Sequence, residues 1–351
     1  MFNRKRVSWL LLGFGLICFA GIKYQNIVKS LPSKLSLTNL PQNLYLPPQK
    51  DFRIVVISDL NSQYGSTEYE PEVKNAIALI PQWQPDLVLS GGDMIAGQKT
   101  SLSNTQIESM WTAFDRHIAA PLRQSEIPFG FTIGNHDGSG AIKDRSLIFQ
   151  RERDLARAYW RKYRDRLRLN FVDAENFPFY YSFQKDGIYF LVWDASTHNI
   201  SPEQLRWIEK ALSSPIARQS QLKIAIGHLP LYPIAAAKNK PGEYLAEGDK
   251  LRSLLQQNQV KIYISGHHHA YYPGKKEQLE LLHAGALGQG SRQLINSNLP
   301  PYPTVTIIDI ETATSKLVYT TYNAQTWELI PIEQLPPKIS VDRNSILRHD
   351  L

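Results

Sequence analysis

The 351-residue sequence predicts an α/β fold in which five short, buried strands each lead into a polar loop that contains glycine. Runs rich in Val, Ile and Leu without polar alternation are typical of strands buried on both faces. Such runs occupy residues 53–57, 86–90, 129–133, 222–226 and 261–265. Because open α/β sheets bind ligands outside the carboxyl ends of their strands, the residues after these runs are candidates for a functional site.

Each of the five runs is followed by a segment that carries metal-binding side chains. The segments are S-D-L-N (58–61), G-G-D (91–93), G-N-H-D (134–137), G-H (227–228) and G-H-H-H (266–269). Carboxylate, amide and imidazole groups are common ligands of divalent metals. One such segment carries little information, whereas five at strand ends predict a single shared site. Their glycines are expected to allow sharp turns and close backbone approach, at positions 92, 134, 227 and 266.

Three helices are expected between the first strand and residue 170. Residues 70–82 and 104–120 have helical periodicity, and the second segment places apolar residues at helical spacing (Ile107, Met110, Trp111, Phe114 and Ile118). Residues 150–168 predict a basic amphipathic helix. Its expected apolar face consists of Leu155, Tyr159, Tyr163 and Leu167.

The second half of the chain predicts further strands and one well-marked helix. Residues 178–183 and 187–193 alternate like a strand pair joined through Lys185, Asp186 and Gly187. Ser201, Pro202 and Glu203 supply an N-cap, a first helical residue and a first-turn acid for a helix that ends near Leu212. Strands are expected at 279–284, 303–310 and, at a sheet edge, 315–322. Residues 331–351 lack a clear period and are expected to form a C-terminal tail.

Composition limits the class of protein. A hydrophobic content of 42% is sufficient for a folded core and excludes disorder throughout the chain. The net charge of +7 is concentrated at 143–168, a segment that contains ten Lys or Arg and four Asp or Glu. This excess suits an anionic partner. Nucleic acid is disfavoured as that partner, because the aromatic residues fall at core-like positions and not in exposed loops.

The N-terminus predicts export or membrane attachment. Arg4, Lys5 and Arg6 precede an apolar stretch at 7–22, so residues 1–22 have the form of a signal peptide or an N-terminal membrane anchor. No clear cleavage site precedes Lys23, which favours the anchor. Residues 23–50 contain four prolines and are expected to be a linker before a domain at 51–330. The positive-inside rule then places that domain on the non-cytoplasmic side of the membrane.

The ordered series of motifs resembles the calcineurin-like metallophosphoesterases. That family has Asp-x-His, Gly-Asp, Gly-Asn-His-Asp/Glu, a later His and Gly-His-x-His, and the match covers roughly residues 51–290. The resemblance implies a four-layer α-β-β-α sandwich of two mixed sheets with two divalent metal ions at the carboxyl ends of the strands. It also implies hydrolysis of a phosphomonoester or phosphodiester by a metal-activated water.

The resemblance also implies a role for each residue. Asp59 and His269 would bind the first metal, Asp93 would bridge the two metals, and three residues would bind the second (Asn135, His228 and His267). His136 would stabilise the transition state or protonate the leaving oxygen, with Asp137 orienting its ring. Taken alone, these residues have ordinary alternatives: Asp59 could cap a helix, and His228 could be a structural histidine. His268, between two ligands, is expected to point away.

The first motif departs from the family pattern, because Asn61 stands where the family has histidine. An amide oxygen is a weaker and harder ligand than imidazole, so the first site is expected to favour Mn, with Fe, Zn, Ni or Mg as alternatives, and to be weakly occupied. Purple acid phosphatases compensate with a tyrosine three residues after the bridging aspartate, but that position here is Ala96. Tyr64 is another candidate to replace the missing histidine ligand.

The substitution at position 61 leaves a second function open. The alternative to a phosphoesterase is a membrane-anchored binding module that holds one metal or is not catalytic.

Substrate contacts are expected from two segments. The basic helix follows the G-N-H-D segment, so Arg145, Arg151 or Arg153 could contact phosphate, unless these arginines form a solvated or lipid-facing surface. The polar, glycine-rich segment 286–294 could line the pocket through Gln289 and Arg292. The sequence does not separate a monoester from a diester, and it does not indicate an oligomeric state.

Overall fold

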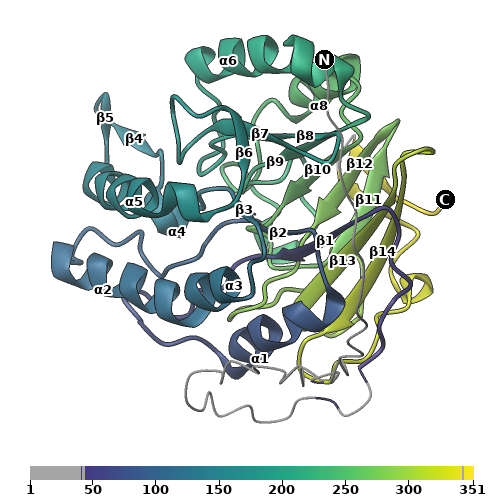
Figure 1. The fold of residues 1–351 in the computed structure, drawn as a ribbon, viewed down its shortest axis with the longest axis horizontal. Coiled ribbons are helices and arrows are strands. Elements are labelled where there is room, and N and C mark those ends of the chain that lie inside the picture. The colour runs from purple at the N-terminus through teal and green to yellow at the C-terminus, as the bar shows by residue number, and fades with distance from the viewer. Residues whose placement is uncertain (1–40, 42–43, 342–343) are drawn as a thin grey trace, which may run out of the picture. The chain divides into compact units, whose positions relative to one another are not determined.

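The computed structural model describes residue 41, residues 44–341 and residues 344–351 (Figure 1). The expected signal or anchor at 1–22 and most of the expected linker therefore lie outside the described residues. Within the described part of the chain, no helix combines the length and the apolar character that a membrane span requires.

Two mixed sheets form the centre of the fold. The five-stranded sheet has the order β14-β13-β1-β2-β3, with β1 (Phe52–Ile57), β2 (Leu87–Ser90), β3 (Phe129–Phe131), β13 (Thr304–Glu311) and β14 (Lys316–Asn323). The nine-stranded sheet has the order β15-β16-β11-β12-β10-β9-β8-β7-β6. Its strands are β6 (Asn170–Asp173), β7 (Tyr181–Lys185), β8 (Ile188–Val192), β9 (Leu222–Ile226), β10 (Ile262–Ser265), β11 (Tyr272–Lys276), β12 (Leu279–His283), β15 (Lys338–Val341) and β16 (Asn344–Arg348).

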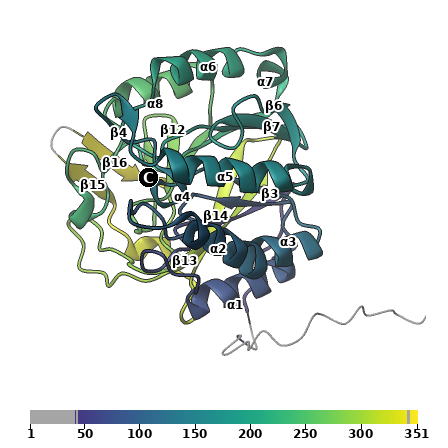
Figure 2. The ribbon, with the colours of Figure 1, turned by 90° about the vertical axis from the view of Figure 1, so that its left-hand side faces the viewer.

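Helices cover the outer face of each sheet, as Figures 1 and 2 show. Below the five-stranded sheet lie α1 (Pro71–Leu79), α2 (Asn104–Phe114) and α3 (Ala120–Gln124), and above the nine-stranded sheet lie α6 (Pro202–Leu212), α7 (Pro215–Gln219) and α8 (Gly248–Gln257). The inner faces of the sheets pack together, for example through Phe52 and Phe190, whose ring centroids are 6.3 Å apart. The expected four-layer α-β-β-α sandwich is thereby confirmed.

The strands that precede the five motifs run parallel to one another within each sheet. β1, β2 and β3 form one parallel set, and β8, β9, β10 and β12 form the other. All residues of β1, β2, β3, β9 and β10 are buried, as expected for strands covered on both faces. The carboxyl ends of each parallel set point in one direction, so the five motifs emerge at a common edge.

Several elements begin and end as local sequence signals predict. Ser201 caps α6, where its side chain accepts a hydrogen bond from the amide of Gln204, and Pro202 is the first helical residue. β7 and β8 form the expected hairpin, and Asp186 and Gly187 at its turn both have positive φ, of 48° and 79°. β14 lies at the edge of its sheet, as expected.

The helices of the first half differ in detail from expectation. The segment 104–120 is not one α-helix: α2 is followed by a π-helical turn, η2 (Asp115–Ala119), and then by α3. The short segment α4 (Asn135–Gly138) leads through the hairpin of β4 (Ile142–Lys143) and β5 (Ser146–Leu147) to α5 (Gln150–Tyr163). The other short helical turns are η1 (Ile80–Trp83), η3 (Arg164–Arg166), η4 (Ala236–Lys238) and η5 (Ile332–Gln334).

The buried face of α5 also differs from the predicted one. The residues most buried on this helix are Glu152, Ala156 and Trp160, whereas Leu155 and Tyr159 are only half-buried. The ring of Trp160 stacks on Phe131 with centroids 3.7 Å apart, which fixes α5 beside β3. The predicted face is nonetheless correct in part, because Tyr159 stacks on Trp111 with ring centroids 4.7 Å apart and Leu167 is buried.

Residues 331–351 do not form an irregular tail. β15 and β16 pair with each other, and β16 pairs with β11, so these strands extend the nine-stranded sheet. The pairing could not be read from the sequence because β11 contains Pro273 and Gly274, which are unfavourable in strand interiors. β6 and α8 were also missing from the expected elements. Residues 44–50, inside the expected linker, contact the domain through a hydrogen bond from Arg53 to the carbonyl of Pro47.

Candidate metal centre

The five motifs meet in two groups of potential metal ligands that share one carboxylate. In the first group, ligand atoms of Asp59, Asp93 and His269 lie within 4.8 Å of one another. In the second, the same holds for Asp93, His228 and His267. These residues are buried except for His269, which is half-buried. A carboxylate shared by two ligand groups is suited to bridge two cations.

The first group is built around Asp59, which follows β1. Nε2 of His269 lies 3.1 Å from Oδ1 of Asp59, and the hydroxyl of Ser58 donates to Oδ2 at 2.6 Å. The other ring nitrogen of His269, Nδ1, lies 3.0 Å from the carbonyl oxygen of Gly290. This hydrogen bond places the proton on Nδ1 and leaves Nε2 free to bind a cation.

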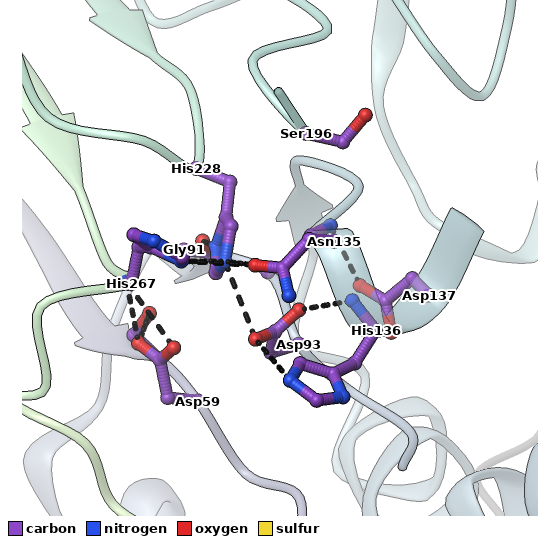
Figure 3. A network of polar contacts seen from close by, with 12 residues as sticks. Asp59, Gly91, Asp93, Asn135, His136, Asp137, Ser196, His228 and His267 are labelled. Atoms are coloured by element: carbon purple, nitrogen blue, oxygen red, sulfur yellow. Dashed lines mark hydrogen bonds and ion pairs between the residues drawn. The ribbon is translucent and has the colours of Figure 1, made fainter. Parts of the chain in front are cut away.

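The second group is built around the side-chain oxygen of Asn135 (Figure 3). Oδ1 of Asn135 lies 2.9 Å from Nε2 of His228 and 2.9 Å from Nδ1 of His267. Nε2 of His228 is also 3.3 Å from Oδ2 of Asp93. The second ring nitrogen of His228 faces the carbonyl of Gly91 at 2.8 Å. The atoms that converge are thus one amide oxygen, one carboxylate oxygen and two imidazole nitrogens.

The backbone at the ligands is strained or tightly packed. Four of the ligands have left-handed backbone, with φ of 50° at Asp59, 54° at Asp93, 64° at His267 and 53° at His269. Among the flanking glycines expected to turn the chain, Gly92 has positive φ (96°), whereas Gly134 is needed for close approach. A Cβ at Gly134 would lie 2.1 Å from Oδ1 of Asp93.

The carboxylates and imidazoles of the two groups shift one another's pKa values. Burial by itself raises the pKa of Asp93, but the neighbouring His228 and His136 outweigh this effect and hold its pKa well below the ordinary value. The pKa of Asp59 is also lowered, against its burial, by His269. Burial disfavours the charged form of His228, yet Asp93 raises its pKa to about 9. The carboxylate, amide and imidazole donors of the two groups fit divalent cations.

A family comparison agrees with this geometry. Residues 52–271, which include all of the ligands above, match the sequence profile of the calcineurin-like phosphoesterases. The chain belongs to the calcineurin-like phosphoesterase family. The family depends on two metal ions, and the two ligand groups that share Asp93 are the candidate positions for them.

Individual relatives include purple acid phosphatases. Purple acid phosphatase 22 of Arabidopsis thaliana is 24% identical over 276 residues, which are 76% of this chain and 57% of that protein. The chain therefore spans little more than half of this relative. The purple acid phosphatase PPD1 from yellow lupin (Lupinus luteus) seeds superimposes with a TM-score of 0.57 at 18% identity, over 82% of this chain and 54% of the lupin chain.

A second solved structure shares the fold. GAP50, the anchor in the inner membrane complex of Plasmodium, superimposes with a TM-score of 0.51 at 14% identity. The match covers 80% of this chain and 87% of GAP50. At these identities the two solved structures show the fold alone.

Within this phosphoesterase fold, His136 lies beside the metal ligands. Its main-chain amide donates to Oδ1 of Asp93 at 2.8 Å, and Nε2 of its ring lies 3.9 Å from Oδ2 of the same residue. Nδ1 faces the carbonyl of Gly97 at 3.0 Å, and the ring of Tyr64 packs against the ring of His136 with centroids 5.1 Å apart. His136 is therefore positioned at the edge of the candidate site with Nε2 directed toward it.

Asp137 does not orient His136, contrary to the sequence-based expectation. Its Oδ1 accepts hydrogen bonds from the amides of Met94 and Ile95 at 2.7 and 3.0 Å, and its Oδ2 accepts one from the amide of Gly134 at 2.8 Å. Burial and the nearby Asp93 raise the pKa of Asp137 to about 7. Asp137 joins the loop after β2 to the loop after β3, and the carbonyl of Gly97 has the orienting role.

Asn61 is buried next to the first ligand group. Its main-chain amide donates to the carbonyl of Asp93 at 3.2 Å, and its own carbonyl accepts from the amide of Gln289 at 3.2 Å. Its side chain makes no hydrogen bond to any other described residue. Tyr64 contacts His136 and does not join the ligands, so nothing in the described structure replaces the family histidine.

The expected substrate-contacting residues are distributed unevenly around the site. Arg292 lies close to it: its amide donates to the carbonyl of His269 at 2.9 Å, and Nη1 is 3.4 Å from the carbonyl of His267. The side chain of Gln289 donates to Glu70. Arg145 is exposed at the β4–β5 turn and, among the described residues, has no hydrogen bond or ion pair.

The other arginines considered as phosphate ligands are already occupied. Arg153 pairs with Asp194 at 2.7 Å and donates to the carbonyl of Gly138 at 2.8 Å. Arg151 donates to the carbonyls of Thr100 and Leu102. Both residues connect α5 to neighbouring loops and do not point free guanidinium groups at the metal ligands.

Sequence reasoning missed a buried connection between α5 and the site. Both oxygens of Glu152 accept main-chain hydrogen bonds, from Gln98 at 2.9 Å and from Lys99 at 3.3 Å. The side-chain oxygen of Gln98 accepts from Nδ2 of Asn135 at 2.7 Å, which turns Oδ1 of Asn135 toward the histidines. Glu152 lies in a helix that is mostly basic in sequence, and Gln98 lies in a loop. Neither residue belongs to a periodic pattern that would have predicted its contact.

The remaining histidines are structural or peripheral. His268 is buried and points away from the ligands, as expected: Nδ1 accepts from the amide of Ile234 at 3.2 Å, and Nε2 lies 2.9 Å from the carbonyl of Glu243. His283 is buried, and its Nδ1 donates to the carbonyl of Tyr272 at 3.3 Å. His198 is exposed and contacts Asn199.

Proposed function

We propose that the protein is a metal-dependent phosphoesterase that hydrolyses a phosphomonoester or a phosphodiester. The observation that carries this proposal is the membership of Asp93 in both ligand groups. Asp59 and His269 would hold the first metal with Asp93, and Asn135, His228 and His267 would hold the second with Asp93. When bound, two such ions polarise the phosphoryl group, activate water and offset the charge that develops during in-line displacement.

Residues of the chain itself would supply the remaining functions. His136 is placed to donate a proton to the leaving oxygen or to stabilise negative charge, because Nδ1 is held by Gly97 and Nε2 faces the ligands. Arg292, beside His267 and His269, is the best supported phosphate contact. Gln289 and Arg145 are weaker candidates, since Gln289 is engaged with Glu70 and Arg145 has no contact to the site.

Manganese is the proposed metal. The first group offers two carboxylates and one imidazole, and the amide of Asn61 is the only nearby addition from the first motif. Hard oxygen ligands suit Mn or Mg better than Zn, although the imidazoles of the second group also accommodate Fe, Zn or Ni. The first site would lose its metal more readily than the second, because it has fewer imidazole donors.

The decisive experiment measures hydrolysis of p-nitrophenyl phosphate and of bis-p-nitrophenyl phosphate by the metal-free protein after addition of Mn²⁺, Zn²⁺, Fe²⁺, Ni²⁺ or Mg²⁺. Activity with at least one metal that is lost in Asp93→Ala supports the proposal. A rate equal to that of Asp93→Ala with every metal would refute it. Extension to phosphomonoesters, cyclic nucleotides and phospholipid head groups would identify the substrate class.

One observation favours a second candidate function. The side chain of Asn61 replaces a metal-binding histidine without a substitute nearby, so a one-metal or non-catalytic binding module on the same fold is the alternative. The presence of His136 favours the phosphoesterase over the binding module. Its ring is placed to act on the substrate and is not one of the proposed metal ligands. Metal content near one ion per chain, together with no hydrolysis, would favour the alternative.

We further propose that the chain is exported or membrane-anchored, with the phosphoesterase domain on the non-cytoplasmic side. The support is the basic cluster Arg4, Lys5 and Arg6 before the apolar residues 7–22. Fractionation of cells that express the full-length chain, with protease added outside the membrane, tests this placement. Recovery of a protected protein in the cytoplasmic fraction would contradict it.

A further inference from the structure

One ligand histidine has a carboxylate partner outside the five motifs. Nε2 of His267 lies 2.8 Å from Oε2 of Glu243, whereas Nδ1 of the same ring lies 2.9 Å from Oδ1 of Asn135 and 3.3 Å from Nε2 of His228. The two ring nitrogens thus face different partners. Nδ1 faces the second ligand group, and Nε2 faces a loop that precedes α8.

The loop that carries Glu243 is anchored by the residue next to His267. Nδ1 of His268 accepts hydrogen bonds from the amides of Ile234 and Ala235, at 3.2 and 3.4 Å. Its proton therefore resides on Nε2, which donates to the carbonyl of Glu243 at 2.9 Å. The buried His268 ring consequently joins both ends of the loop 234–243 and fixes the main chain of Glu243 beside His267.

The carboxylate of Glu243 is also held from its other side. Nζ of Lys238 lies 2.6 Å from Oε2 of Glu243 and 3.4 Å from Nε2 of His267. The ammonium group balances the charge of the carboxylate, so His267 does not have to be protonated to keep this contact. Lys238 and His267 therefore both donate to the carboxylate of Glu243 at the margin of the second ligand group.

This arrangement has a direct consequence for metal binding. A histidine that binds a cation through Nδ1 must carry its proton on Nε2, and a carboxylate that accepts that proton in a hydrogen bond fixes the tautomer and the ring orientation. Partners of this kind strengthen metal affinity or activity by about 10- to 100-fold. His228 and His269 have only carbonyl partners in the equivalent role, at Gly91 and Gly290.

We propose that Glu243 is a positioning residue that holds His267 with Nδ1 directed at the second metal. The inference rests on the two-metal site of the proposed function. It assigns Glu243 an effect on the second site through His267, because within the described part of the chain the ion pairs of Glu243 are with Lys238, Lys240 and His267.

The test is titration of Co²⁺ and Zn²⁺ into the metal-free full-length protein, followed by calorimetry and by the visible spectrum of bound Co²⁺. Glu243→Ala is expected to weaken binding at the second site, which the proposed function makes the tighter of the two, by about 10- to 100-fold and to leave binding at the first site unchanged. Glu243→Gln retains an oxygen that can accept from Nε2 of His267, so it should recover part of the lost affinity. Glu247→Gln, which removes an exposed carboxylate paired with Lys250, is the matched control and should bind both ions normally.

A double-mutant cycle separates positioning from general destabilisation. If Glu243 acts through His267, then Glu243→Ala should cause no further loss of second-site affinity in a His267→Ala background. An equal loss in both backgrounds would overturn the proposal, and so would unchanged Co²⁺ and Zn²⁺ binding by Glu243→Ala. If the unmodified protein binds only one ion or none, the two-metal function fails together with this inference. Two ions bound with the same affinities by the unmodified protein and by Glu243→Ala would refute the role of Glu243 alone.

Discussion

Nδ1 of His136 lies 3.0 Å from the carbonyl oxygen of Gly97, so the loop after β2 orients a histidine that belongs to the loop after β3. The same loop reaches Asn135 through Gln98 and is itself held by Glu152 from α5. The catalytic candidate and one ligand of the second metal are thus positioned by neighbouring residues of one segment. A shift of this segment would affect both groups.

Replacement of His136 by alanine should lower turnover without loss of metal. Among the described residues, the ring nitrogens of His136 face the carbonyl of Gly97 and, at 3.9 Å, Oδ2 of Asp93. A positioned acid or base contributes about 10²- to 10⁴-fold to a rate. We expect kcat with the best phosphoester substrate to fall within that range while two metal ions remain bound. Metal analysis of the same preparation provides the control, and a loss of metal equal to that in Asp93→Ala would contradict the assigned role.

Replacement of Asn61 by histidine should strengthen the first metal site. An imidazole would add the ligand that the family motif contains, next to Asp59 and His269. We expect about tenfold tighter binding of the more weakly bound ion, or about 1.4 kcal/mol, measured by competition with a chelator. Asn61→Ala is the comparison variant. Equal affinity in the histidine and alanine variants would show that residue 61 does not face the metal.

The ion pair between Arg53 and Asp309 should contribute strongly to the stability of the five-stranded sheet. The guanidinium donates to both carboxylate oxygens, at 2.9 and 3.0 Å, and to the carbonyls of Trp83 and Pro47, and both side chains are buried. Removal of one partner leaves an unpaired buried charge, so Asp309→Asn is expected to lower the free energy of unfolding by about 3–5 kcal/mol. Urea unfolding measures this change, and Asp186→Asn, at an exposed turn, should have little effect.

Stability should decline in mild acid because of His283. Burial lowers the pKa of its imidazole to about 4, against an ordinary value of 6.5. The unfolded chain binds a proton here below pH 6.5, but the folded protein does not until about pH 4. Stability is therefore present above pH 6.5 and is lost as the pH falls through this window, with about 2 kcal/mol lost between pH 7 and pH 5.

The variant His283→Asn isolates this effect, because asparagine keeps a donor near the carbonyl of Tyr272 but does not titrate. Its free energy of unfolding should change less between pH 7 and pH 5 than that of the unmodified protein, by about 2 kcal/mol. Parallel pH dependences in the two proteins would assign the acid sensitivity to other groups.

The layers and the ligand groups could be predicted from the sequence because they depend on local signals. Buried β-runs identified the strands before Asp59 and His228, and the order of the motifs linked them into one site. The role of Asp137 could not be predicted, since a carboxylate next to His136 has several amides within reach and the fold decides among them. Glu243 had no signal at all: it lies in a loop, and its contact with His267 is created by the His268 anchor.

The C-terminal strands were missed for a related reason. β16 pairs with β11, which is distant in sequence and contains Pro273. Neither segment has a local pattern that predicts this pairing. The buried face of α5 likewise depends on Phe131, which accepts the ring of Trp160. Side-chain periodicity identified the helix, whereas the partner surface determined which residues are buried.

The pairing of β1 with β13 joins two segments that are far apart in the sequence. Phe52 lies opposite Ile310, so the strand that leads to Asp59 gains this neighbour only after most of the chain has been synthesised. At about 5–20 residues per second, the ribosome needs about 10–50 s to cover that separation. The five-stranded sheet is therefore complete only after synthesis of most of the chain, and the proposed metal ions would be those available where folding finishes.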